Sequence, residues 1–593
     1  MAAHDDEVIG KAYDARLMRR LVGYLRPYRS QVLLAIVAII GHSMLELAPP
    51  FLTKVVIDTY IPARDLSGLG AVAVGYFAIL LGAFGLEYLQ TWTMQLTGQR
   101  IMFDLRMQIY GHLQRLDVAF YDKNPVGRLM TRVTTDVDVL NELFTSGVVS
   151  VFGDLFTLFG IMAVLVWMDW RLALVAFSVL PLVAFIAQWF RRNVRESYRT
   201  VRTWVARINA FLQEHITGMA TAQLFRREAA DFDAFERIDR SYRDANLQSI
   251  FYYALFYPAI ELVSALAASL ILWVGGGWVL DDALTMGSLV AFLQYSQRFF
   301  RPISDMSEKF NVLQGAMASS ERIFALLDTP VGIAASMETL SQRDIAAGFG
   351  PKAGHIRFEQ VTFAYTPGQP VLRDVSFEIL PGQRVGIVGA TGSGKTTIVS
   401  LLLRFYDIQE GRITIDGVDI REMDLRELRA RFGLVLQDVH LFSGTIAANV
   451  RLGRDSISNE DIERALAAVH ADRFVHRFPG GIRAAVAERG ATLSVGQKQL
   501  LSFARALAFN APVLILDEAT SSVDTETELL IRDALKVLMR GRTTLAIAHR
   551  LSTIQDMDHI LVMHRGQLRE SGTHQQLLAE QGIYRRLYEL QFA

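Results

Sequence analysis

The chain has 593 residues, with 60 Lys and Arg, 61 Asp and Glu, and no cysteine. Its length exceeds what a single hydrophobic core accommodates, so we expect more than one domain. The formal net charge of −1 gives no overall positive field that would favour a nucleic-acid partner, and the missing cysteine excludes disulfides, thiolate metal sites and a cysteine nucleophile.

Residues 1–30 are predicted to form a cytoplasmic or interfacial segment that contains a helix. Asp5, Asp6 and Glu7 stand before any Lys or Arg, whereas a secretory signal begins with basic residues and a transit peptide avoids acids. From Lys11 onwards, basic side chains are interleaved with leucine, valine and tyrosine, which is typical of an amphipathic helix on a membrane surface. An ordinary solvated helix is the alternative interpretation.

Hydrophobic residues make up 51% of the chain, and they are concentrated in its first half. A bilayer crossing takes about 20 predominantly apolar residues. We therefore expect residues 31–325 to form an all-α transmembrane domain of six helices, with Gly275–Gly277 and Asp281–Asp282 marking a turn before the last one. The predicted spans lie near residues 31–52, 70–94, 146–168, 171–190, 251–275 and 285–304.

Two long connections, near residues 95–145 and 191–250, join the predicted spans and are rich in arginine. An excess of Lys and Arg marks the cytoplasmic side of a membrane protein. Apolar residues recur at spacings of three and four along both connections, so we expect the membrane helices to continue into the cytoplasm.

Four acidic residues lie within the predicted spans. Charge at membrane depth is expensive and usually faces a bundle interior or a cavity, so these carboxylates could attract a cationic or zwitterionic cargo. A location near the end of a span, or pairing with a basic or polar neighbour, is the alternative. The four residues are Glu46, Glu87, Asp154 and Glu261.

Residues 326–354 break the apolar pattern with Pro and Gly and are predicted to be a linker. Strands then alternate with helices over residues 355–593, which is the pattern of an α/β domain. The expected architecture is therefore a six-helix membrane domain followed by an α/β nucleotide-binding domain.

A phosphate-binding loop follows a buried strand that begins at Arg384. The sequence from Gly389 to Thr396 reads G-x-x-x-x-G-K-T between a strand and a helix, which is the context this motif requires. Its glycines let backbone N–H groups turn towards phosphate, while Lys395 can reach the β- and γ-phosphates and Thr396 can hold Mg²⁺. The predicted ATP-binding residues here are Gly389, Ala390, Thr391, Gly392, Ser393, Gly394, Lys395, Thr396 and Thr397.

An apolar strand that begins at Pro512 ends in two acids, Asp517 and Glu518. An acid at a strand end beside a phosphate loop can hold Mg²⁺ directly or through water, and we assign that role to Asp517. Glu518 is predicted to polarise the water that attacks the γ-phosphate. Alone, the two acids could simply be solvated, but together with the phosphate loop they favour ATP hydrolysis.

A further motif in the second half is far more specific than the phosphate loop. Leu493, Ser494, Val495, Gly496 and Gln497 resemble the L-S-G-G-Q signature of the ATP-binding cassette (ABC) transporters. With the membrane part first and the ATPase part second, nearly the whole chain resembles an exporter-type half-transporter of that family.

The resemblance implies further site residues. Tyr365 corresponds to the aromatic residue that stacks on adenine, and Gln437 to the glutamine that contacts Mg²⁺ or water and senses the membrane domain. Asp524 corresponds to the loop aspartate that reaches the partner's site, and His549 to the switch histidine at the γ-phosphate. Each could alone be an ordinary structural residue, but their joint occurrence in family order favours the functional assignment.

The resemblance also implies a dimer, because in this family each ATP lies between the phosphate loop of one chain and the signature of the other. Val495 departs from the family, which usually has Gly at that position. A β-branched residue resists a positive φ and crowds a close approach to phosphate. Heterodimeric exporters of this family often pair such a chain with a partner that lacks the glutamate but has a regular signature. The resemblance therefore implies a heterodimer with one strong and one weak ATPase site, and a homodimer that tolerates Val495 is the alternative.

The predicted function is ATP-driven export of an amphiphilic substrate, such as a drug, lipid or peptide, by a multi-pass protein of the bacterial inner membrane. Its ATPase domain is expected to face the cytoplasm and to use ATP and Mg²⁺. The expected partners are a second half-transporter and membrane lipid, with no nucleic acid. An ATP-gated channel or regulator is the alternative, whereas the six apolar stretches exclude a soluble ABC ATPase. Segments that begin at Phe120 and Thr217 resemble the coupling helices of exporters, and ordinary helix–turn–helix tips are the alternative.

Overall fold

The computed structural model describes residues 14–333, 354–518, 525–548 and 554–592, and it leaves out the side chains of 146–150, 300–308, 310–311, 518, 525–526, 548 and 591–592. The chain divides into two compact units. The helical unit comprises Met1–Gln114 and Val126–Thr329, and the sheet unit comprises Arg115–Pro125 and Pro330–Ala593.

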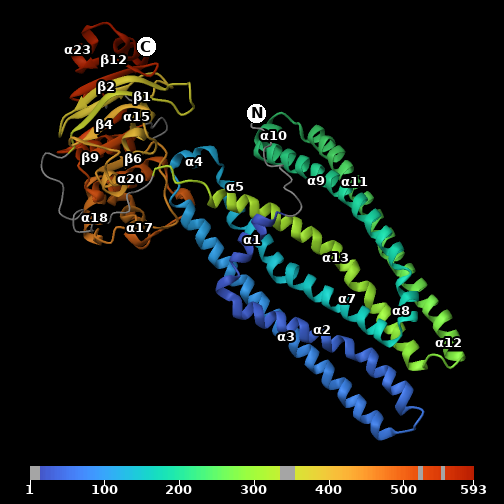
Figure 1. Ribbon diagram of the computed structural model, residues 1–593. Coiled ribbons are helices and arrows are strands. Elements are labelled where there is room, and N and C mark those ends of the chain that lie inside the picture. The colour runs from blue at the N-terminus through green and yellow to red at the C-terminus, as the bar shows by residue number, and fades with distance from the viewer. Residues whose placement is uncertain (1–13, 334–353, 519–524, 549–553, 593) are drawn as a thin grey trace. The chain divides into compact units, whose positions relative to one another are not determined.

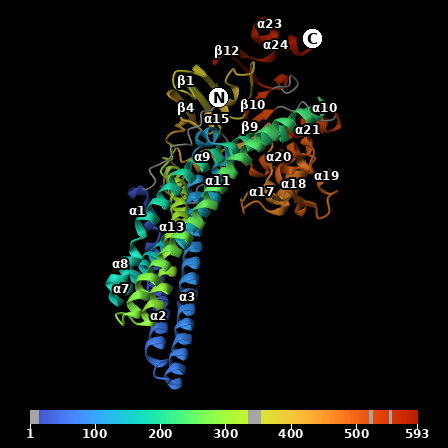
Figure 2. The same ribbon diagram turned by 90° about the vertical axis from the view of Figure 1, so that its right-hand side faces the viewer.

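Long helices that lie alongside one another build the helical unit (Figures 1 and 2). In the described part of the chain, five helices are long and apolar enough to cross a membrane, and α13 covers the sixth predicted stretch. This agrees with the predicted six-helix domain. The main helices are α2 (Arg29–Val55), α3 (Leu66–Leu113), α7 (Val148–Met168), α8 (Trp170–Phe177), α9 (Leu180–Thr217), α11 (Glu228–Leu270) and α13 (Met286–Leu327). Shorter helices are α1 (Ala15–Gly23), α5 (Val126–Val133), α6 (Thr135–Glu142), α10 (Met219–Leu224) and α12 (Gly276–Leu280).

Several of these helices are much longer than a bilayer crossing needs. α3 has 48 residues, which is about 72 Å at 1.5 Å per residue, against a hydrocarbon core of about 30 Å. α9, α11 and α13 have 38, 43 and 42 residues. The long connections are thus helical, as their apolar spacing predicted.

The turn predicted at Gly275–Gly277 is wrong, because these glycines continue the helix. Gly275 ends a π-helical turn, Ile271–Gly275, and Gly276 begins α12. The chain turns only at Asp281. A Cβ on Gly275 would lie 2.8 Å from Leu289 Cδ1. Glycine at 275 therefore serves close packing against α13.

The N-terminal helix α1 packs on the end of α13 through one side chain in particular. The Arg20 guanidinium donates to both carboxylate oxygens of Asp328, at 2.7 and 2.8 Å, and lies 4.2 Å from the centroid of the Phe324 ring. This guanidinium holds the pKa of Asp328 below its usual range. Leu21 is buried, so only part of α1 is available to a membrane surface.

Two sheets and their covering helices form the sheet unit (Figure 1). The six-stranded sheet has the order β12-β11-β3-β10-β9-β6, and the four-stranded sheet has the order β2-β1-β4-β5. The strands are β1 (Ile356–Phe363), β2 (Leu372–Ile379), β3 (Arg384–Val388), β4 (Glu410–Ile415), β5 (Val418–Asp419), β6 (Phe432–Val435), β7 (Gly444–Thr445), β8 (Ala485–Val486), β9 (Val513–Glu518), β10 (Thr543–Ala548), β11 (His559–His564) and β12 (Gln567–Gly572). The helices are α4 (Val118–Lys123), α15 (Lys395–Leu402), α16 (Leu425–Ala430), α17 (Ile446–Arg451), α18 (Asn459–Ala468), α19 (Asp472–Val475), α20 (Val495–Phe509), α21 (Thr525–Met539), α23 (His574–Ala579) and α24 (Ile583–Phe592).

The six-stranded sheet is buried on both faces, which explains the continuous apolar runs of its strands. Successive side chains of a strand point to opposite faces. Thus Val513 and Ile515 join the core on the side of the four-stranded sheet, whereas Leu514 and Leu516 join the core under α20. This packing fixes the direction of β9 and therefore the position of the two acids at its end.

Candidate nucleotide-binding site

The candidate site lies at the edge of the six-stranded sheet where the carboxyl ends of β3, β10, β9 and β6 meet. These four strands are parallel neighbours. Ile547 of β10 pairs with Ile387 of β3 on one side and with Asp517 of β9 on the other. Asp517 is therefore level with the last residues before the phosphate loop, two strand spacings or about 10 Å away. Ligands of open α/β sheets bind at this edge.

The phosphate loop, residues 389–394, needs glycine because of both its backbone angles and its neighbours. Gly392 and Gly394 have φ values of +79° and +100°. A Cβ on Gly394 would lie 2.5 Å from Leu372 Cδ2, and a Cβ on Gly389 would lie 2.3 Å from the Met563 carbonyl oxygen. The loop consequently carries few side chains, and its N–H groups and the start of α15 can face an anion.

Lys395 is the first residue of α15 and is only 7% exposed. Its Nζ donates to the carbonyl oxygens of Gly389 and Ala390, at 2.8 and 3.1 Å. Burial lowers the pKa of Lys395, and the negative charge of Asp517 opposes that shift. A buried ammonium group that bonds only to loop carbonyls can exchange them for phosphate oxygens.

Two hydroxyl groups beside Lys395 fit a bound phosphate. The Ser393 hydroxyl is buried and has no hydrogen-bond partner among the described residues. Such an orphan is expensive in a native core and is typical of a position that a ligand completes. Thr396 is exposed at the first turn of α15, where its hydroxyl can meet a ligand or a cation.

The oxygen donors of the site suit a hard cation such as Mg²⁺. They are the Thr396 hydroxyl, the Asp517 carboxylate and the side-chain amide of Gln437, which follows β6 at the same edge of the sheet. Within the described ranges, no group of three or more acidic or histidine side chains could hold a metal by itself.

Three predicted residues lie outside what the structure describes in full. Glu518 ends β9, where its backbone pairs with Ala548 of β10, but its side chain is not among the described ones. Asp524 and His549 lie outside the described residues altogether. His549 directly follows Ala548 in the sequence.

Tyr365 lies beside the phosphate loop and is 43% exposed. Its hydroxyl donates to Thr397 Oγ1 at 3.2 Å, which ties the ring to α15. The Tyr406 ring meets it edge to face, with centroids 4.9 Å apart and planes at 88°. An exposed aromatic ring held in this way can stack on a nucleotide base.

Tyr406 is a site residue that the sequence did not reveal, because it belongs to no motif. Its hydroxyl hydrogen-bonds to the carboxylate of Asp122 in α4. Burial, together with this hydrogen bond, raises the pKa of Tyr406. The predicted adenine contact, Tyr365, is thus joined through Tyr406 to the first predicted coupling segment, whose helix belongs to the sheet unit.

The signature residues form the start of α20. Ser494 is the N-cap: its hydroxyl accepts from the Gln497 N–H at 3.2 Å, and Gln497 Oε1 accepts from the Ser494 N–H at 3.0 Å. This capping box fixes the start of a 15-residue helix. Leu493 and Gly496 are buried, which leaves Ser494 and Val495 exposed at a helix end that attracts anions.

Val495 corrects one expectation from the sequence. It is the first residue of α20 and does not have a positive φ, so its β-branched side chain causes no backbone strain. The predicted conformational penalty is therefore wrong, because the position is helical. The Val495 side chain is nevertheless 55% exposed where a ligand would approach, so it can still crowd a phosphate there.

A groove of about 230 Å³ lies beside Gln437, with a largely apolar lining. Leu436 and Val439 contribute on either side of Gln437, and Phe509 of α20 closes one wall. Arg505 also lines it: burial lowers the pKa of its guanidinium, which donates to the Asn449 carbonyl oxygen at 2.9 Å. The groove can accept an apolar helix tip.

Family comparisons match both halves of the chain. The ABC transporter transmembrane region matches residues 32–303, and the ABC transporter domain matches residues 372–521. An uncharacterized ABC transporter ATP-binding protein of Bacillus subtilis, YknV, is 38% identical over 599 residues, covering 99% of this chain and 96% of the relative.

Other relatives and a solved structure agree in architecture. The ATP-dependent lipid A-core flippase of Syntrophus aciditrophicus is 35% identical, covering 97% of this chain and 94% of the flippase. A fatty acid ABC transporter of Mycobacterium bovis is 39% identical, covering 86% of this chain and 79% of the relative. The structure of a bacterial Atm1-family ABC exporter with ATP bound has a TM-score of 0.78 and 28% identity, and the match covers 95% of this chain and 98% of the exporter.

Proposed function

This chain belongs to the ABC transporter family as an exporter-type half-transporter, and on that premise we propose how its residues couple ATP to export. It is a multi-pass membrane protein that binds ATP and hydrolyses it to drive export, and proteins of this kind work as dimers. The proposed domain boundaries follow residues 1–30, 31–325, 326–354 and 355–593.

ATP is proposed to bind at the carboxyl ends of the parallel strands. The main support is that the phosphate loop, Asp517 and Gln437 all follow or end strands at this one edge of the sheet. The adenine stacks on Tyr365, and the phosphates lie on the loop of residues 389–394 with Lys395 reaching the outer two. Glu518 polarises the attacking water, and His549 contacts the γ-phosphate. In a site of this kind the chain contributes mostly position and electrostatic stabilisation.

Mg²⁺ is proposed to be held by Thr396, Asp517 and Gln437, with phosphate oxygens and water as its other ligands. When bound, it neutralises charge on the transferred phosphoryl group. Gln437 lies after β6 and next to the apolar groove, which Leu436 and Val439 line. Movement of a group bound in the groove would therefore move Gln437, a residue of the proposed Mg²⁺ site.

The second chain is proposed to complete each ATP site with the exposed end of its α20. Ser494 and the free N–H groups there would meet the γ-phosphate only after the two ATPase domains close. We retain a different half-transporter as the proposed partner because the exposed Val495 would crowd that approach, with a homodimer as the alternative. Co-purification from the native membrane distinguishes the two.

Two contacts are proposed to carry the ATP-driven closure to the membrane helices. The first is α4, through the hydrogen bond of Asp122 to Tyr406. The second is the end of α10, where Leu224 and the following residue, Phe225, are 76% and 69% exposed. This apolar tip suits the groove beside Gln437 on a partner subunit, because the groove is mainly apolar.

The proposed activity is uphill export of an amphiphile from the cytoplasm or the inner leaflet of the cell membrane. The test is accumulation of substrate in inverted vesicles or proteoliposomes that contain the dimer. ATP-dependent accumulation above the outside concentration supports a pump. Ion flux that persists with bound ATP and only runs downhill would instead favour the gated channel.

A further inference from the structure

A cavity of about 920 Å³ opens along α9 in the helical unit, and arginine dominates its lining. Its lining contains four arginines and one glutamate, which leaves an excess of three positive charges. Three of these residues, spaced four apart, form what we call the arginine row: Arg191, Arg195 and Arg199. The remaining lining residues are Ala184, Ala187, Gln188, Arg192 and Glu196.

The arginine row occupies a different face of α9 from the one that packs on α11. On the packing face, the Phe190 ring stacks on Phe256 at 4.0 Å, and the Ser197 hydroxyl donates to the Ala245 carbonyl oxygen at 3.4 Å. At about 100° per residue, the row lies roughly a third of a turn from this face. Its side chains are therefore not needed to hold α9 against α11.

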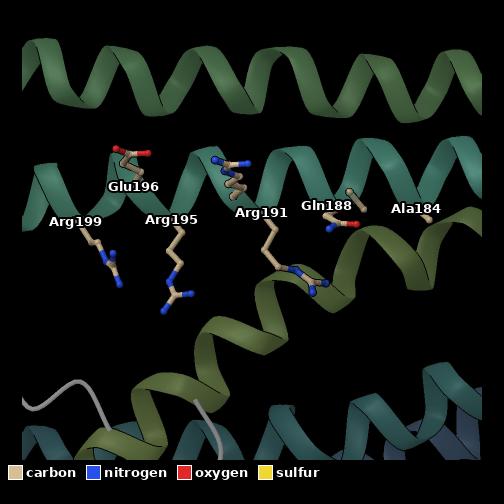
Figure 3. A pocket seen from close by; sticks show the side chains of 8 residues that line it. Ala184, Gln188, Arg191, Arg195, Glu196 and Arg199 are labelled. Atoms are coloured by element: carbon tan, nitrogen blue, oxygen red, sulfur yellow. The ribbon is translucent and has the colours of Figure 1, made fainter. Parts of the chain in front are cut away.

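The guanidinium groups of the row point into the cavity. Figure 3 shows Arg195 and Arg199 extending from one side of α9 and Glu196 from the opposite side. In the described part of the chain, neither Arg195 nor Arg199 has an ion pair or a hydrogen bond from its side chain. Two adjacent guanidinium groups without an acceptor repel each other, so an anion that reaches both is stabilised.

The lining changes character along the helix. Ala184 and Ala187 lie within the apolar stretch predicted to span the membrane, residues 171–190, whereas Arg191 begins just beyond it. Arg side chains at the end of a membrane helix sit at the level of lipid head groups. The cavity thus presents an apolar end on the membrane side and a cationic end on the cytoplasmic side.

We propose that this cavity binds the exported substrate, and that the substrate is an anionic amphiphile. A carboxylate or phosphate head group bonds to the arginine row, because guanidinium matches planar and tetrahedral oxyanions through paired N–H donors. The acyl chain lies along the end of the cavity that Ala184 and Ala187 line. This assignment rests on the proposed export function and names the substrate class for it.

The acids in the predicted spans suggested a cationic or zwitterionic cargo, whereas the cavity lining favours an anionic one. None of the four acids in the predicted spans lines the cavity. Asp154 is half-buried and paired with Lys309, which is the ordinary alternative for a carboxylate in a membrane span. Glu87 and Glu261 are exposed residues of α3 and α11.

The test is equilibrium binding of radiolabelled palmitate to the full-length dimer in phosphatidylcholine nanodiscs. Hexadecyl phosphate, hexadecyltrimethylammonium, acetate and inorganic phosphate serve as competitors, and basal ATPase is measured on the same samples. The double variant Arg195→Gln/Arg199→Gln is compared with Arg207→Gln, which changes an exposed arginine of α9 outside the cavity. We expect palmitate Kd to rise about tenfold in the double variant and to stay within twofold in the control.

The charge-reversed variant Arg195→Glu/Arg199→Glu separates recognition from structure. It should bind hexadecyltrimethylammonium better than palmitate, a reversal that a merely structural role would not produce. Equal palmitate affinity in wild type and the double variant overturns the inference, and so does equal competition by cationic and anionic amphiphiles. If basal ATPase activity is present in those samples, the proposed export function still stands. Displacement of palmitate by acetate or phosphate at equal concentration would overturn it in favour of small soluble anions. A wild type without ATPase activity would instead contradict the proposed function.

Discussion

In the sheet unit the candidate functional groups follow the ends of neighbouring strands, whereas in the helical unit they lie along one face of a single helix. The strand ends bring together residues from distant parts of the sequence, such as Lys395, Gln437 and Asp517, with little freedom in their placement. The arginine row instead comes from three residues, spaced four apart, within nine consecutive residues of α9. The proposed chemistry thus depends on a rigid sheet edge, while the proposed cargo recognition depends on the spacing of side chains along a helix.

The largest expected effect follows from breaking the chemistry of the sheet unit alone. Glu518→Gln removes the proposed base and keeps the shape of the side chain, so turnover should fall at least a hundredfold while ATP binding is retained. Steady-state ATPase and equilibrium binding of labelled ATP measure the two. The matched control is Glu463→Gln on the exposed side of α18, which should leave both unchanged. Near-normal turnover in Glu518→Gln would remove Glu518 from the proposed mechanism.

The next effect comes from separating the two units without touching either site. Two glycines inserted after Lys123, at the end of α4, would let the Asp122 contact move without moving the membrane helices. We expect basal ATPase within about threefold of wild type and loss of most ATP-dependent substrate accumulation in proteoliposomes. The same insertion at Gly481, in a surface turn of the sheet unit, is the control. Transport that survives the α4 insertion would show that α4 does not carry the coupling.

A smaller effect is expected from the aromatic contact of the sheet unit. Tyr365→Ala removes base stacking, which is worth ~1–3 kcal/mol per base, so KM for ATP should rise about tenfold with little change in kcat. Tyr365→Phe keeps the ring and should restore KM, because only the hydrogen bond to Thr397 is lost. Equal defects in both variants would show that this hydrogen bond matters more than stacking.

The smallest effect is expected at the signature. Val495→Gly removes an exposed side chain from the first turn of α20 and costs at most about 1 kcal/mol of helix stability, because the capping box of Ser494 remains. If Val495 is tolerated, ATPase should change less than twofold. A tenfold or larger gain would show that the isopropyl group crowds the partner's phosphate. ATPase of the purified dimer, with thermal unfolding as a check on folding, measures this.

The two units also differ in what their sequence discloses. The phosphate loop and the acids at the end of β9 are short motifs of adjacent residues, so Gly394 and Asp517 could be proposed as site residues without a structure. Tyr406 could not, since only folding brings it against Tyr365 and Asp122. The φ of Val495 could not be assigned either, because a helix N-terminus and a glycine-like turn share the same sequence there.

In the membrane half, the number of helices and their length follow from the apolar runs and the three-and-four spacing. The face on which each helix packs cannot be predicted in this way, because the hydrophobicity of an apolar span is nearly uniform around the helix axis. From the sequence alone, the arginines of α9 indicate only the cytoplasmic side of the membrane. Their spacing of four residues did place Arg191, Arg195 and Arg199 on one face, but the cavity gives that face its meaning.

The central claim is that nucleotide bound by the sheet unit changes the shape of the helical unit. The absence of cysteine allows spin labels at two introduced cysteines, Met107→Cys on α3 and Phe232→Cys on α11, both exposed positions of the helical unit. The distance between them is measured by double electron–electron resonance in nanodiscs, in the Glu518→Gln background with and without ATP. The account predicts that ATP shifts the distance distribution and that Lys395→Met abolishes the shift. An unchanged distribution with ATP demonstrably bound would contradict it.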